Sequence, residues 1–227
     1  MADTDSTRQF TRIAGLLLLS LVFSATSQAQ TRSSAAGAAE AAVTWRPFFL
    51  ASGDHFTARK TFDAVLGAQA LRPFWGGGVQ IGSRRGLFVE IAVSRFRGTG
   101  QRAFVANGQA FPLGIPLTAT LTPVEVMGGY RYRWSKTVLP YAAVGVGRYA
   151  YSETSAGNDA GEDVAESRVG LLLLGGAEFR LHRWIGLGVD VQYTRVTGLL
   201  GKAGTSQASG EDDLGGTAAR VKVLVGR

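Results

Sequence analysis

Residues 186–193 read Gly-Leu-Gly-Val-Asp-Val-Gln-Tyr, a run in which small or polar residues alternate strictly with large apolar ones. Successive side chains of a β-strand point to opposite faces of its sheet. As a strand, this run has one apolar face and one face that carries the carboxylate of Asp190. The apolar face consists of Leu187, Val189, Val191 and Tyr193.

The same period of two recurs at 87–94 and 221–226, and further runs at 75–82, 124–134 and 169–181 continue it. A soluble β-protein buries such an apolar face in its core, whereas an outer-membrane barrel turns it toward lipid and keeps polar residues inside. We predict the second arrangement. The predicted lipid-facing residues are Leu87, Val89, Ile91, Val93, Leu187, Val189, Val191, Val221, Val223 and Val225.

The N-terminus has the three parts of a secretory signal peptide. Arg8 and Arg12 precede the apolar run Ile13–Phe23, and small residues lead up to Ala29. The apolar run is shorter than the roughly 20 residues that span a bilayer as a helix. We therefore expect residues 1–29 to be a cleaved signal peptide, residues 30–43 a flexible leader and residues 44–227 the barrel.

The composition fits an exported barrel. The 227 residues include no cysteine, 31 glycines and 6 prolines, and the net charge is +7. Without disulfides, an exported chain needs a sizeable core or a membrane to stabilise it. Glycine within strands suits a narrow, curved barrel with a crowded interior. Because the basic residues are scattered rather than gathered on one helix, the charge favours contact with anionic lipid headgroups over nucleic-acid binding.

Turn-forming residues separate eight strand-like runs. We place them at 44–51, 73–83, 86–105, 117–134, 138–153, 167–181, 184–198 and 217–226. The first is the least regular because it contains Pro47, and 56–66 could extend or replace it. Tight turns alternate with long polar connections, which predicts an all-β, antiparallel up-and-down transmembrane barrel with periplasmic turns and external loops. The residues around Asn107-Gly108 predict a hairpin that projects beyond the membrane.

The polar faces of these strands carry charges of both signs. The predicted inward-facing residues are the acids Glu90, Glu125, Glu178 and Asp190 and the bases Arg131, Arg133, Arg168, Arg180, Arg220 and Lys222. Buried charges are costly unless they are paired, and eight strands leave room for side chains but not for a wide channel. We predict a barrel-interior ion-pair network that plugs the lumen, with a gated proton or ion path as the alternative.

Aromatic residues fall near both ends of the strands. Tyr132, Trp134 and Trp184 lie close to tight turns, and Trp75, Tyr149 and Tyr151 lie near the long connections. Two such levels are typical of the two membrane–water interfaces. We expect Trp75, Tyr132, Trp134 and Trp184 to be interfacial aromatics.

The sequence offers no recognisable catalytic or metal-binding motif. His55 and His182 have no second His or Cys at ligand spacing, and no serine stands in a nucleophile elbow. We therefore expect no catalytic residue, no bound metal, no cofactor and no enzymatic activity. The acidic runs 158–163 and 211–213 are open to two interpretations: a divalent-cation site that bridges lipopolysaccharide, or solvated loops.

Three further runs carry a resemblance to a known family. They are Phe88-Val-Glu-Ile-Ala-Val-Ser-Arg-Phe96, Phe111-Pro-Leu-Gly-Ile-Pro-Leu117 and Gly210-Glu-Asp-Asp-Leu-Gly-Gly216. Over most of residues 44–227 the chain resembles the small eight-stranded outer-membrane barrels of the OmpA-like and OmpW-like type, and the outer-membrane β-barrel proteins of acidobacterial genomes. The resemblance implies a membrane-anchoring, adhesive or small-solute role. Such barrels usually end on an aromatic residue, whereas this sequence ends Val223-Leu-Val-Gly-Arg227, which predicts weaker recognition by the insertion machinery.

The sequence leaves three hypotheses about function. The first is a non-enzymatic integral outer-membrane barrel with a plugged polar interior, long extracellular loops and a structural or surface-interaction role. The second is a narrow channel for small hydrophobic solutes, which requires an apolar lumen. The third is a soluble periplasmic lipocalin-like lipid carrier, which requires the apolar faces to point inward. For the first, we expect a monomer whose partners are outer-membrane lipids, lipopolysaccharide and the barrel-insertion machinery.

Overall fold

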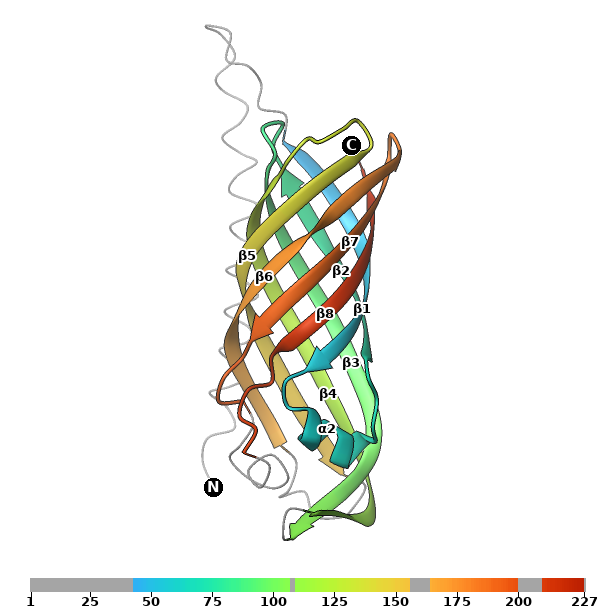
Figure 1. Cartoon of the computed structure of the whole chain (residues 1–227), viewed down its shortest axis with the longest axis vertical. Coiled ribbons are helices and arrows are strands. Elements are labelled where there is room, and N and C mark those ends of the chain that lie inside the picture. Colours follow the sequence, from blue (N-terminus) through green and yellow to red (C-terminus); the bar gives the residue numbers. More distant parts are fainter. Residues whose placement is uncertain (1–42, 107–108, 156–163, 200–209, 227) are drawn as a thin grey trace, which may run out of the picture. The chain divides into compact units, whose positions relative to one another are not determined.

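The computed structural model describes residues 43–106, 109–155, 164–199 and 210–226, which form strands and one short helix (Figure 1). The strands are β1 (Thr44–Phe56), β2 (Arg72–Gly82), β3 (Leu87–Ala106), β4 (Gln109–Arg131), β5 (Val138–Ser155), β6 (Val164–His182), β7 (Ile185–Arg195) and β8 (Gly216–Val225). Helix α2 (Arg59–Leu66) lies between β1 and β2. Within the described residues, no helix is both long and apolar enough to cross a membrane.

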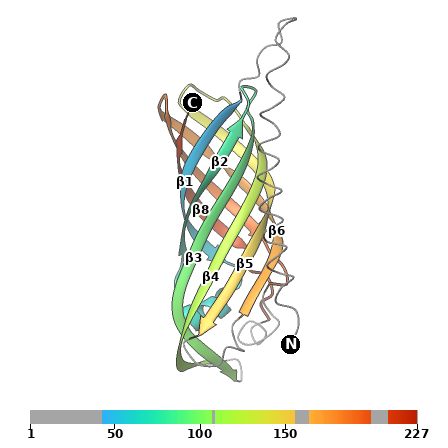
Figure 2. The same cartoon turned by 180° about the vertical axis from the view of Figure 1, so that it is seen from behind.

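The strands form a closed antiparallel barrel, as the two opposite views show (Figures 1 and 2). Each strand pairs with its neighbour in the sequence, and β1 closes the barrel by pairing with β8. At this seam Ala51 lies between Trp75 of β2 and Val221 of β8. Closure pairs the strand edges, which is necessary in lipid because no water is there to bond free backbone groups. The predicted eight-stranded up-and-down barrel is confirmed.

The connections are short at one end of the barrel and mostly longer at the other. Residues 83–86, 132–137 and 183–184 make the short connections, at the end where β1 begins and β8 ends (Figure 1). We call this the turn end. The longer connections, including the one with α2, join the strands at the opposite end, which we call the loop end. The alternation of connection lengths agrees with the sequence pattern except between β3 and β4, which residues 107–108 alone connect at the loop end.

Most strands begin and end close to their predicted positions, with two differences near the loop end. β1 continues to Phe56, and its pairing with β8 begins only at Phe48, just after Pro47. The idea that 56–66 extends or replaces the first strand is wrong, because 59–66 form α2. The pairing of Ala106 with Gln109 confirms a hairpin around 107–108, so most of 106–116, expected to be a connection, is strand. That the hairpin projects beyond the membrane stays a prediction.

The two faces of the barrel wall differ sharply in polarity. On β7, Val189 and Val191 are 45% and 60% exposed, whereas Asp190 between them is 2% exposed. The same holds on β3 and β8, where the exposed side chains are Leu87, Val89, Ile91, Val93, Val221, Val223 and Val225; Leu187 of β7 is partly exposed. A lipocalin-like carrier needs the reverse arrangement, so that hypothesis is wrong.

The aromatic residues of the wall divide between its two faces. Trp75 is exposed on the outside of β2, and Tyr132, Trp134 and Trp184 are exposed in the short connections at the turn end. Tyr149 and Tyr151, which we predicted to lie at the membrane interface near the long connections, are instead buried in the lumen. The reason is the period of two on β5, where both tyrosines alternate with exposed residues and therefore point inward.

Glycine allows close approach of the wall to itself and to its contents, as the crowded-barrel prediction requires. A Cβ at Gly78 of β2 would lie 2.0 Å from the Ile91 carbonyl oxygen and 2.7 Å from Cζ of Phe48. Gly86, in the tight turn before β3, has φ 95°, a left-handed conformation that favours glycine. A side chain at either position would force the neighbouring strands apart.

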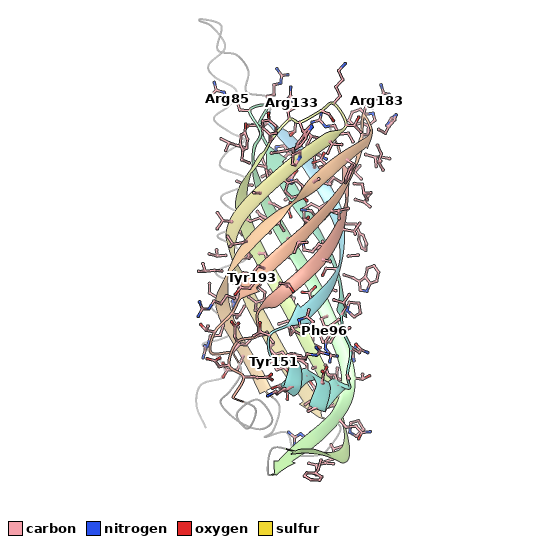
Figure 3. All side chains as sticks on the ribbon, in the orientation of Figure 1. Arg85, Phe96, Arg133, Tyr151, Arg183 and Tyr193 are labelled. Atoms are coloured by element: carbon pink, nitrogen blue, oxygen red, sulfur yellow. The ribbon has the colours of Figure 1, made fainter. Side chains whose placement is uncertain are left out.

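The lumen is filled by different side chains at different heights. At the loop end, buried apolar residues form a cluster that we call the loop-end plug (Figure 3, around Phe96 and Tyr151). Its members are Phe56, Ala58, Phe62, Phe74, Phe96, Leu117, Ala119, Leu121, Tyr149, Tyr151, Val196, Leu199 and Leu214. Phe62 of α2, together with Ala58 just before the helix, brings α2 into this plug. Beyond the plug, toward the turn end, the interior becomes charged.

Candidate functional site: the barrel interior and its turn-end cavity

Arg220 is the centre of a buried ion network inside the barrel. It is the cross-strand neighbour of Asp190, and its Nε lies 2.9 Å from Asp190 Oδ1. Its two Nη atoms lie 3.2 Å from Glu90 Oε1 of β3 and 3.4 Å from Glu125 Oε2 of β4. One guanidinium therefore joins carboxylates from three strands, two of which lie across the lumen from β8.

Lys222, two residues further along β8, supplies the second cation. Its Nζ lies 3.0 Å from both carboxylate oxygens of Glu90 and 3.1 Å from Asp190 Oδ2. The rings of Phe48 and Tyr141 lie 5.6 and 5.1 Å from the same nitrogen, within cation–π range. The side chain is 1% exposed, so the ammonium depends on these groups instead of water.

Neutral side chains donate further hydrogen bonds to these carboxylates. The donors are Tyr141 to Asp190 at 2.6 Å, Tyr149 and Gln192 to Glu125 at 2.7 and 2.8 Å, and Gln80 to Glu90 at 3.0 Å. Tyr141 and Tyr149 were not predicted as members of the network, because both faces of 138–153 carry apolar groups and its orientation was ambiguous. Buried carboxylates with several donors are rigidly held, so the network fixes the packing of the lumen.

Glu178 holds a second ion cluster nearer the turn end. Arg46 donates to both oxygens of Glu178, at 2.6 and 3.0 Å, and an Nη atom of Arg131 lies 3.2 Å away. Gly186 leaves room for this contact, because a Cβ there would lie 2.8 Å from Arg46 Nη2. Arg46 was not among the predicted residues, since Pro47 made the first strand uncertain. The period of two along β1 could have identified it, because Arg46, Phe48 and Leu50 all point inward.

Three arginines predicted for the interior network lie outside it. Arg133 follows the end of β4 and is exposed in a turn. Arg168 of β6 is exposed and lies 3.5 Å from Glu166. Arg180 is exposed at the turn end, where β6 approaches its short connection to β7. The period of two indicates the face on which a side chain lies but not its height, and near the barrel ends water solvates a guanidinium.

The loop-end plug is held in place by a carboxylate from a distant connection. Glu211 accepts hydrogen bonds from the backbone N–H groups of Lys60 and Thr61, at 3.0 and 2.8 Å, and from Thr61 Oγ1 at 2.6 Å. These N–H groups belong to the first turn of α2, where backbone donors have no partner within the helix. Asp213 likewise accepts from Val196 and Gly215. Among the described residues no group of three potential metal ligands occurs, and 158–163, the other acidic run, lies outside them.

Replacing Glu211 with alanine should loosen α2. Loss of a helix-capping acceptor costs about 0.5–2 kcal/mol, and here the cost falls on a helix of eight residues. We expect faster amide hydrogen exchange in α2, measured by mass spectrometry on the barrel in micelles. Asp212→Ala is the matched control, because Asp212 is exposed and its carboxylate has no hydrogen bond within the described residues. Equal exchange in the two variants would rule out the capping role.

A cavity of about 580 Å³ opens at the turn end of the barrel, and we call it the turn-end vestibule. Its lining within the described residues includes seven arginines and a single carboxylate: Arg46, Arg84, Arg85, Arg131, Arg133, Arg180, Arg183 and Glu178. Figure 3 shows Arg85, Arg133 and Arg183 gathered at this end. The vestibule was not predicted because its residues come from separate strands and tight turns that only barrel closure brings together.

The chain matches the outer membrane protein beta-barrel domain over residues 15–225. It belongs to this family of outer-membrane barrels. The family and the apolar outer wall agree in pointing to the outer membrane, and they confirm the resemblance noted from the sequence. No curated protein matches the sequence.

Solved structures of other outer-membrane barrels have a similar fold. A major outer membrane protein from Thermus thermophilus aligns with 82% of this chain and 100% of its own, at 11% identity and a TM-score of 0.54. Neisserial surface protein A aligns with 81% of this chain and 96% of its own, at 12% identity and a TM-score of 0.48. OprG from Pseudomonas aeruginosa aligns with 81% and 92%, at 14% identity and a TM-score of 0.47. At these identities the likeness concerns the fold alone.

Proposed function

We propose that this outer-membrane barrel is a non-enzymatic, closed element of the cell envelope whose loop end faces the exterior and makes structural or surface contacts. The observation that carries the proposal is the filled lumen. The loop-end plug closes one end, and the carboxylates joined by Arg220 and Lys222 cross the lumen between it and the turn-end vestibule. The cavity between the plug and this network measures only about 30 Å³, room for a water molecule or two.

The outer wall supports the lipid partners in this proposal. Exposed valine, leucine and isoleucine side chains cover it, and aromatic residues such as Trp75 and Trp184 stand on it. In lipid such a wall is stable, whereas in water it would be an aggregation surface. Outer-membrane lipids and lipopolysaccharide are thus the proposed neighbours of the wall. Entry through a cleaved signal peptide and the barrel-insertion machinery completes the proposed route.

The charged interior argues against the alternative of a channel for small hydrophobic solutes. An apolar solute moving through the lumen would have to displace Arg220 and Lys222 from their carboxylates without offering them any hydrogen bond. Unpaired buried charges of this kind are costly. A gated proton path would likewise need one of these bonded carboxylates to release its partners. The described residues of the interior therefore favour closure.

Solute flux into proteoliposomes tests closure directly. Purified full-length protein is reconstituted, and insertion is verified by a band that migrates faster without boiling than after boiling. We expect small sugars, amino acids and apolar solutes to enter at the rate measured for protein-free liposomes. Entry well above that rate, with the same heat-shifted band present, would contradict the proposal and favour the channel.

A further inference from the structure

We propose that the turn-end vestibule is a binding site for a phosphate group. Its volume of about 580 Å³ falls within the range of small-molecule sites in proteins. It opens at the end opposite α2 and the loop-end plug, so its role is separate from any contact made by the loops. The proposal therefore goes beyond the closed-barrel function and does not depend on it.

Glu178, the only carboxylate among the described lining residues, lies at the floor of the vestibule and is already bonded to arginines. Glu178 is 1% exposed, and both of its oxygens accept hydrogen bonds from Arg46, while Arg131 lies 3.2 Å from one of them. Two guanidinium groups thus share a single negative charge. The floor is left with an excess positive charge before the rim is considered.

The rim adds guanidinium groups that no carboxylate of a described residue neutralises. Arg84, Arg85, Arg133 and Arg180 make no side-chain hydrogen bond or ion pair with any residue that the structure describes. Arg183 lies over the Trp184 ring at 5.9 Å, an aromatic contact that leaves its charge intact. Like charges around a concave opening produce a strongly positive potential that attracts anions.

Two buried polar atoms of lining residues also lack a partner. Within the described residues, neither Ser83 Oγ nor Arg131 Nε makes a hydrogen bond, although each is shielded from solvent. Ser83 stands at the start of the tight turn that carries Arg84 and Arg85. Native proteins seldom leave buried donors unused. An anion with several oxygens in the vestibule would give such donors acceptors.

Phosphate fits this site better than other small anions. It carries up to two charges and several oxygens in different directions, so it can bond guanidinium groups from several sides at once. A single carboxylate would bond only one guanidinium group in this way. The phosphate group has two sources at a membrane surface, the headgroup of an anionic phospholipid and a soluble phosphate compound. The same recognition chemistry serves both.

Calorimetric titration of the full-length barrel in non-ionic micelles tests the site with two probes. Inorganic pyrophosphate represents the soluble source, and dihexanoyl phosphatidylglycerol represents the lipid headgroup. We expect saturable binding of at least one probe, weakened by added salt. In Arg84→Gln/Arg180→Gln the affinity should fall about tenfold or more, because two charge-assisted contacts are lost. Both arginines are exposed, so the variant should keep its heat-shifted band.

Arg97→Gln/Arg195→Gln is the matched control. Both arginines are exposed, lie outside the vestibule lining, and change the net charge by the same amount when replaced. Its affinity should stay within about twofold of the parent protein. Binding of pyrophosphate alone identifies a soluble ligand, binding of the lipid alone identifies a headgroup, and binding of both shows that phosphate suffices. No binding of either probe, or equal weakening in the two variants, would overturn the proposal without affecting the flux result.

Discussion

Replacing Lys222 with methionine is expected to lower the free energy of unfolding by about 3–5 kcal/mol, the usual cost of removing one partner of a buried ion pair. Methionine keeps the unbranched stem, so the packing of the side chain against Phe48 and Tyr141 is largely preserved. What disappears is the ammonium that bonds both oxygens of Glu90 and one of Asp190. Urea unfolding of the barrel in phospholipid vesicles measures the change.

Two further variants separate this effect from a general one. Lys136→Met makes the same chemical change at an exposed turn residue and should alter stability by no more than about 0.5 kcal/mol. Glu90→Gln/Lys222→Met removes one charge of each sign, so the double variant should lose less than the two single variants added together. We expect a coupling energy of about 0.5–3 kcal/mol, as for residues in one network. Strict additivity would show that Glu90 and Lys222 do not depend on each other.

The barrel itself could be predicted from the sequence because its signal is repeated in most strands. Each strand needs one apolar and one polar face, and a shift of one residue would turn every side chain to the wrong side. The alternation around Asp190 therefore specifies both strand and orientation, and the neighbouring strands repeat the same information. The short connections then predict which strands are neighbours. His182 and Ile185, for example, are paired residues on adjacent strands, and only a tight turn can join residues so close in sequence.

Alternation was less informative about what lies at each height of the lumen. It correctly gave the inward face to Glu90, Asp190, Arg220 and Lys222, and these four side chains meet in the structure. It gave no indication of which inward arginine is buried and which reaches water at a barrel end, as the exposed Arg180 illustrates.

Helix α2 was missed for a related reason. It has only eight residues, and although Phe62, Val65 and Leu66 share one apolar face, so short a run does not distinguish a helix from a strand. The carboxylate that bonds its first turn belongs to Glu211, about 150 residues away in the sequence. Contacts of this kind depend on barrel closure and leave no local pattern. The turn-end vestibule is another product of closure, since its arginines are distributed over several separate segments.

Replacing Val189 with arginine should destabilise the barrel in vesicles by about 2–4 kcal/mol, the cost of an arginine on the lipid face at the bilayer midplane. Val189 is 45% exposed on the outer wall, so the new side chain would enter lipid instead of the ion network. It also lies about halfway along β7 between Trp184 and Tyr193, two exposed aromatics of the kind that mark the membrane interfaces. The urea midpoint in phospholipid vesicles gives the measurement.

Ile185→Arg is the matched control for this prediction, because Ile185 faces the same side of the same strand but begins it at the turn end. There the arginine side chain can reach the headgroups, so the cost should fall to about 0–1 kcal/mol. A cost that depends on height in this way is specific to a lipid-facing wall, since a soluble barrel would tolerate arginine equally at both exposed positions. Equal and small losses in the two variants would mean that lipid does not cover β7 where its apolar face is exposed.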